Sequence, residues 1–110
     1  MNSMLQIRVN KERGKTTLVV AGELDYSNIA QLQEEIERQE APRVEVNLKD
    51  LQFMDSSGAG MLLHQARLLR SQNRILEITH IPANISHDLE IIGFFRVLET
   101  LQGAPQRGGE

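Results

Sequence analysis

Short segments with a strand pattern open the chain, and a helix pattern follows them. Residues 5–9 alternate between apolar and polar, the period of a strand with one buried face. A polar turn follows, and the β-branched residues within 16–21 predict a second strand that forms a hairpin with the first. Residues 27–39 then place their apolar side chains on one stripe, which predicts an amphipathic helix. Asp25 or Ser27 is expected to cap it.

Strand and helix patterns keep alternating to the end of the chain. Residues 44–48 predict a third strand, and apolar residues at helical spacing predict a second helix that ends at about residue 70. A strand at 75–79, a short helix at 82–92 and a last short strand at 94–98 follow. The expected order is β-β-α-β-α-β-α-β. Such alternation predicts an α/β fold in which helices pack on a mixed sheet.

Length and composition fit one globular domain. The chain has 110 residues, of which 40% are hydrophobic and 25% charged, and this excludes a disordered chain or a coiled rod. We expect the domain to span residues 1–101. Residues 102–110 contain three glycines and a proline, which predicts a flexible tail. No cysteine is present, so disulfides and thiolate chemistry are excluded.

The N-terminal sequence and the net charge of the chain argue against two further classes of function. The N-terminus lacks a signal-peptide pattern, and no apolar run is long enough to span a bilayer, so we expect a cytoplasmic protein. The net charge of −3 argues against a nucleic-acid partner. The densest basic group is Arg67, Arg70 and Arg74. It is interpreted either as a solvated helix face with its exit loop or as a patch that meets an acidic partner.

Residues 53–60, Phe-Met-Asp-Ser-Ser-Gly-Ala-Gly, form the most distinctive segment. They lie between a predicted strand and a predicted helix start. Ser56 and Ser57 are natural helix caps there, and Gly58 and Gly60 allow another backbone to approach closely. One interpretation is purely structural, with serines that cap and glycines that ease packing. The other is a functional site.

Enzymatic interpretations of this segment lack their required residues. A nucleophile elbow needs glycine two positions before the serine, but Met54 and Asp55 stand there. The third glycine of a dinucleotide fingerprint and the Gly-Lys-Ser/Thr of a phosphate loop are both absent. Asp25 and Asp55 end two strand-like segments and could hold a cation together, but such sites usually need more oxygens. We therefore predict no catalytic residue, no metal and no cofactor.

Residues 47–60 resemble the signature of the STAS domain, especially that of bacterial anti-sigma factor antagonists. The family pattern is apolar-Asp-Ser-Ser/Thr-Gly-x-Gly, which matches Asp55 to Gly60 except that Ala59 replaces a larger apolar residue. Residues 21–25 resemble the family's Gly-Glu-Leu-Asp element, and 92–95 resemble its closing Gly-aromatic step. The similarity covers about residues 4–101. The chain's end leaves little room for a long final helix.

The resemblance implies a fold and a regulatory function. The fold is a mixed sheet with helices on one side. Family members bind a serine-kinase anti-sigma factor of the histidine-kinase-like ATPase fold, which phosphorylates a serine and thereby ends binding. A metal-dependent serine/threonine phosphatase reverses this. By position the acceptor is Ser56, with Ser57 as second candidate, and Asp25, Asp55, Ser57 and Gly58 lie at the partner surface.

This resemblance leaves alternatives open. The same switch could act on an output without a sigma factor, such as secretion, biofilm formation or stress signalling. A STAS accessory subunit of a transporter is another alternative, although such relatives often lack the phosphoacceptor. An enzyme or small-ligand binder is the last. The free protein is expected to be a monomer.

Overall fold

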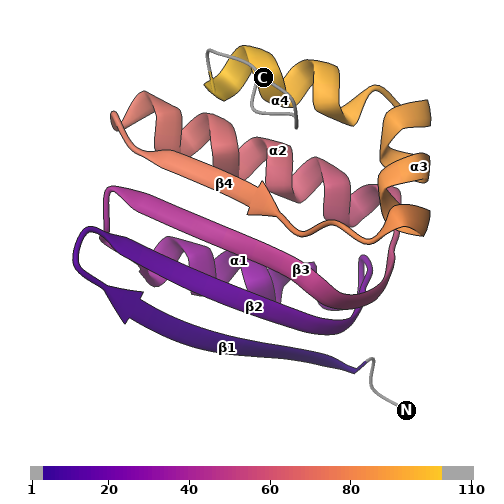
Figure 1. Cartoon of the computed structure of the whole chain (residues 1–110), viewed down its shortest axis with the longest axis horizontal. Helices are drawn as coiled ribbons and strands as arrows, with labels where there is room; N and C mark the ends of the chain where they lie inside the picture. The colour runs from indigo at the N-terminus through magenta and orange to yellow at the C-terminus, as the bar shows by residue number, and fades with distance from the viewer. Residues whose placement is uncertain (1–3, 103–110) are drawn as a thin grey trace.

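The computed structural model describes residues 4–102 (Figure 1). Four strands and four helices follow in this order: β1 (Leu5–Glu12), β2 (Lys15–Leu24), α1 (Ile29–Arg38), β3 (Arg43–Met54), α2 (Ser56–Ser71), β4 (Ile75–Thr79), α3 (Ala83–Ile91) and α4 (Phe94–Gln102). The predicted α/β class is confirmed, as is the predicted order up to α3. Apart from Gln102, which is helical, the predicted tail lies outside the described residues.

One mixed sheet organises the molecule, with its strands in the order β1-β2-β3-β4. β1 pairs antiparallel with β2 as the predicted hairpin, whereas β2, β3 and β4 run parallel. Parallel neighbours need crossover connections, and here α1 and α2 supply them. The carboxyl ends of β2 and β3 therefore meet at the same edge of the sheet.

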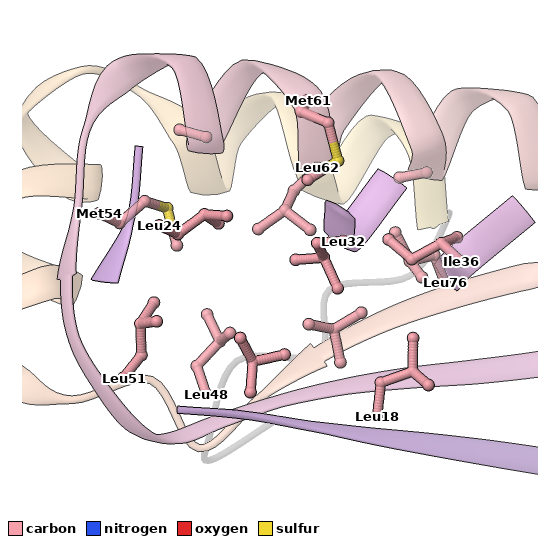
Figure 2. Packing of buried hydrophobic residues seen from close by; sticks show 14 of the residues in the cluster. Leu18, Leu24, Leu32, Ile36, Leu48, Leu51, Met54, Met61, Leu62 and Leu76 are labelled. Carbon is pink, nitrogen blue, oxygen red and sulfur yellow. The ribbon is translucent and has the colours of Figure 1, made fainter. Parts of the chain in front are cut away.

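The hydrophobic core lies between one face of the sheet and the helices. Side chains of the strands point up into it and those of the helices point down, as Figure 2 shows. Leu18, Leu48 and Leu62 are fully buried there. All four helices of residues 4–102 contribute to this single core, so none of them covers the opposite face of the sheet, called the open face below.

β3 is much longer than the predicted strand 44–48. Its second half pairs with β2 through two register shifts, between Val19 and Ala21 and between Gly22 and Glu23. Such bulges bend a strand and change which residues face the core. Gly22 has a φ of 101°, and a Cβ there would lie 1.8 Å from the carbonyl oxygen of Met4. Glycine is therefore required at this bend.

The last element is a helix, so the predicted strand at 94–98 is wrong. Phe94 and Leu98 are buried and Leu101 is partly buried, which is the spacing of an amphipathic helix. Gly93, with a φ of 80°, ends α3 and lets α4 begin at the next residue. The chain end thus accommodates a final helix of nine residues, which packs against α2.

Candidate functional site

The candidate site lies where β2 and β3 end side by side. Leu24 and Met54 are the last partners in the register of these strands. The amide of Asp55 then donates to the carbonyl of Leu24 at 3.1 Å. This pairing brings together the β2–α1 turn and the start of α2. The two predicted motifs, far apart in sequence, therefore form one site.

The carboxylate of Asp55 holds the two segments in place. One oxygen accepts a hydrogen bond from the amide of Gly58 at 3.0 Å and so caps α2. The other accepts from the amide of Tyr26 at 3.1 Å. The prediction that a serine caps α2 is thus wrong, because the aspartate before the serines does so and both serines lie inside the helix.

Asp25 stabilises the β2–α1 turn rather than capping α1. Its carboxylate accepts from the amide of Ser27 at 3.0 Å and from the hydroxyl of Ser27 at 2.6 Å. The cap position of α1 is Asn28, whose side chain accepts from the amide of Asp25 and donates to the carbonyl of Glu23. The predicted caps Asp25 and Ser27 are therefore wrong. The predicted site residue Asp25 nevertheless lies beside the Asp55 segment.

The two candidate serines differ in exposure. Ser56 is exposed at the first position of α2, and Ser57 is half-buried. Ser56 directly follows Asp55, whose position is fixed by backbone amides. The hydroxyl of Ser56 is thus presented on a rigid helix start. A second macromolecule can reach it without local unfolding.

Gly58 is required by packing inside the domain. A Cβ at this position would lie 2.9 Å from the Cδ2 of Leu24 and 2.9 Å from the Cγ of Met54. Figure 2 shows these two side chains next to each other below the first turn of α2. The following Ala59 is also buried, so the departure from the family pattern at this position faces the core. It does not reshape the surface.

Two aromatic residues near the site are exposed, and neither is among the predicted site residues. Tyr26 is 78% exposed and Phe53 is 48% exposed. They flank Asp25 and Asp55, on the same two segments. Aromatic residues are enriched at protein–protein interfaces. The sequence signal that points to these two residues is an aromatic side chain within two positions of each motif aspartate.

Hydrogen bonds hold the carboxylates of the candidate site. Within residues 4–102, neither Asp25 nor Asp55 takes part in an ion pair. The described part of the chain also contains no cluster of three or more acidic or histidine side chains that could hold a metal ion. The two aspartates that could have shared a cation instead accept hydrogen bonds from backbone amides and from Ser27.

A second carboxylate centre lies on the open face of the sheet. Glu45 is 8% exposed and pairs with Lys15 at 2.8 Å, while Thr79 donates to it at 2.5 Å. Burial alone would raise the pKa of Glu45, but the hydrogen bonds from Lys15 and Thr79 and the charges of Lys15 and His80 outweigh it and lower the pKa. The bond to Glu45 raises the pKa of Lys15. This centre joins three strands.

The three arginines of the basic group do not act together. Arg74 donates to the backbone carbonyls of Gln39 and Ala41, and Arg70 donates to that of Leu101. Arg67 is exposed on α2. The basic group is therefore partly structural, and Arg67 is the member whose charge is most available to a partner.

No helix in the described range 4–102 has the length and apolar character needed to cross a membrane.

Comparison with known proteins places this geometry in a family. The STAS domain matches the chain over residues 6–104. The chain is 31% identical to the anti-sigma F factor antagonist of Paenibacillus polymyxa over 98 residues, which cover 86% of this chain and 84% of that protein.

Solved structures share the fold. Unphosphorylated SpoIIAA, an anti-sigma factor antagonist, superposes with a TM-score of 0.68 at 18% identity, covering 92% of this chain and all of that one. The phosphorylated form of the Bacillus cell fate determinant SpoIIAA gives 0.64 at 22% identity, covering 83% of this chain and 85% of that one. The chain belongs to the STAS domain family, and its similar curated relatives are anti-sigma factor antagonists.

Proposed function

We propose that the chain is a non-enzymatic anti-sigma factor antagonist that binds a serine-kinase anti-sigma factor through the surface around Ser56. Phosphorylation of Ser56 by that kinase ends the binding, and a metal-dependent serine/threonine phosphatase restores it. The observation that carries this proposal is the exposed hydroxyl of Ser56 at a helix start whose cap, Asp55, is fixed by two backbone amides. The named function of the Paenibacillus relative supports it.

The domain can accept a phosphate at Ser56 without refolding. A phosphoserine carries about −1.5 to −2 charges at neutral pH. The N-terminus of a helix favours negative charge because the helix dipole and the first amides point toward it. Ser56 is also exposed, so a phosphate there meets water rather than the core. The modified domain therefore keeps its fold.

The partner, in contrast, would experience a large change. In the described chain no cation pairs with Asp25 or Asp55, so the phosphate adds to negative charge that only hydrogen bonds from backbone amides and Ser27 compensate. A partner surface that fits a hydroxyl would have to desolvate that charge, which costs several kcal/mol when no basic group is opposite. A loss of about 4 kcal/mol weakens binding about a thousandfold. This is sufficient for a switch.

The first experiment measures intact mass after incubation with ATP and the purified cognate kinase. Wild type and Ser57→Ala should gain one phosphate, and Ser56→Ala none. Ser71→Ala is a matched control, because Ser71 is also exposed and ends the same helix. If Ser56→Ala still gained a phosphate, the acceptor would be another residue, and Ser57 would be tested next.

The second experiment measures binding of the same kinase by calorimetry. Ser56→Asp should bind about a thousandfold more weakly than wild type, whereas Ser56→Ala should bind about as well. Equal affinity of Ser56→Asp and wild type would contradict the switch.

A further inference from the structure

The outer face of α2 continues from Ser56 along the helix. We use this name for the exposed row formed by Ser56, Gly60, His64 and Arg67. These residues follow one another at helical spacing, and the buried residues of α2 lie on the opposite side. Gly60 lies one turn from Ser56, about 6 Å along the axis. No acidic residue occurs anywhere in α2.

Gly60 has no structural explanation within the domain. A Cβ there would meet no atom within 4 Å, whereas a Cβ at Gly58 would collide with Leu24 and Met54. Its φ also lies outside the left-handed region that favours glycine. Glycine is a poor residue for a helix interior because it increases the entropy lost on folding. The fold itself therefore gains nothing from the missing side chain at Gly60.

We propose that the backbone of the anti-sigma factor partner crosses α2 in van der Waals contact at Gly60, and that an acidic side chain of the same partner pairs with Arg67. This inference rests on the proposed function and extends the docking surface beyond Ser56. A missing side chain allows two backbones to approach closely. Tyr26, whose amide donates to Asp55, is exposed beside the start of α2, at the other end of this surface from Arg67.

The proposed function supplies the occupant, and the charge of Arg67 indicates the chemistry of the segment that meets it. In the part of the chain that the structure describes, Arg67 forms no ion pair, while its neighbour Arg70 donates to Leu101. An acidic segment of another protein is complementary to this face.

The test compares variants of Gly60 in two measurements. Gly60→Ala should raise the thermal midpoint by several degrees, because it improves the helix and meets no atom of the domain. Gly60→Leu should weaken binding of the purified cognate kinase at least about tenfold, because its side chain fills the space of the partner backbone. Arg67→Glu should weaken binding about tenfold, and the effect should shrink at high salt.

Asn10→Leu is the matched control for an added exposed leucine. Asn10 is exposed on β1 and pairs with Thr17 near the hairpin turn. The β1–β2 turn lies at the end of the sheet opposite the start of α2 (Figure 1). Its affinity for the kinase should equal that of wild type. Circular dichroism and the thermal midpoint establish that each variant is folded. If Gly60→Leu is not folded, Gly60→Ala tests the contact in its place.

The outcomes separate this inference from the proposed function. If Ser56→Asp releases the kinase but Gly60→Leu binds as tightly as Asn10→Leu, the contact at Gly60 is refuted and the switch stands. If Arg67→Glu binds as wild type does, the acidic contact is refuted. If wild type neither binds the kinase nor accepts phosphate from it, the proposed function fails first, and this inference fails with it.

Discussion

Asp55 and Glu45 are carboxylates at opposite ends of β3, and they are held in different ways. Asp55 accepts hydrogen bonds from two backbone amides and has no cationic partner in residues 4–102. Glu45 is held by side chains, with Lys15 as its ion-pair partner and Thr79 as a hydrogen-bond donor. Both join segments that are distant in sequence.

This difference separates a charge that is neutralised by an ion pair from a charge that is held by backbone amides. The charge of Glu45 is neutralised inside the molecule, so little of it reaches a visiting protein. The charge of Asp55 is compensated only by amide dipoles, and an exposed serine stands next to it. A further negative charge at Ser56 therefore acts on a partner more than on the domain.

The largest expected loss of stability comes from adding a side chain at Gly58, in the first turn of α2. Gly58→Val should lower the free energy of unfolding by about 2–3 kcal/mol, because the new side chain overpacks against Leu24 and Met54. Urea denaturation measures this. Gly60→Val is the matched control, since its Cβ meets no atom of the domain. Equal destabilisation of the two variants would show that helix propensity, not packing, explains Gly58.

Removing the carboxylate of Asp55 should have the next largest effect. Asp55→Ala should destabilise the domain by about 1–2 kcal/mol, because it removes a helix cap and the acceptor for the amide of Tyr26. Asp55→Asn keeps an acceptor and should cost less. Thermal unfolding compares the two variants. Ser56→Ala should change stability by less than about 0.5 kcal/mol, because it alters an exposed group.

Acidification should weaken the Glu45 centre, with a smaller effect than the loss of the Asp55 carboxylate. The pKa of Glu45 is lowered in the folded state, so its contribution is present above the unfolded pKa and is lost as the pH falls through the folded pKa. The unfolded value is about 4.3, so the loss occurs below about pH 4.3. Glu45→Gln should reduce stability near neutral pH and flatten this part of the acid transition. A transition with an unchanged slope would contradict the assignment.

The sequence predicts the fold well wherever the period of apolar residues is regular. The hairpin, the first helix and β4 follow from simple alternation or helical spacing. The second half of β3 does not, because Leu48, Leu51 and Met54 are buried at intervals of three residues. The bulges against β2 produce this interval. A period-two search therefore ends the strand too early.

The error at the chain end has a different origin. Residues 94–98 are mostly apolar, and a window of that length cannot distinguish a buried strand from a helix. The helical period becomes visible only when Leu101 is included with Phe94 and Leu98.

The site was predictable as a location but not as a set of contacts. The motifs indicate that Asp25, Asp55 and Ser56 belong together, and parallel pairing of β2 and β3 brings their segments to one edge. The bond from the amide of Tyr26 to Asp55 depends on the tertiary fold, so no local pattern reveals it. The different environments of Gly58 and Gly60 likewise required coordinates.

The hydrogen bond between Asp55 and Tyr26 also has a consequence for folding. It closes a separation of 29 residues and spans the crossover between two parallel strands. Such a contact exists only after the intervening loop has been closed, which costs conformational entropy. A chain still emerging from the ribosome, or one that has partly unfolded, does not have the assembled surface. A partner that recognises this surface therefore responds only to completed molecules.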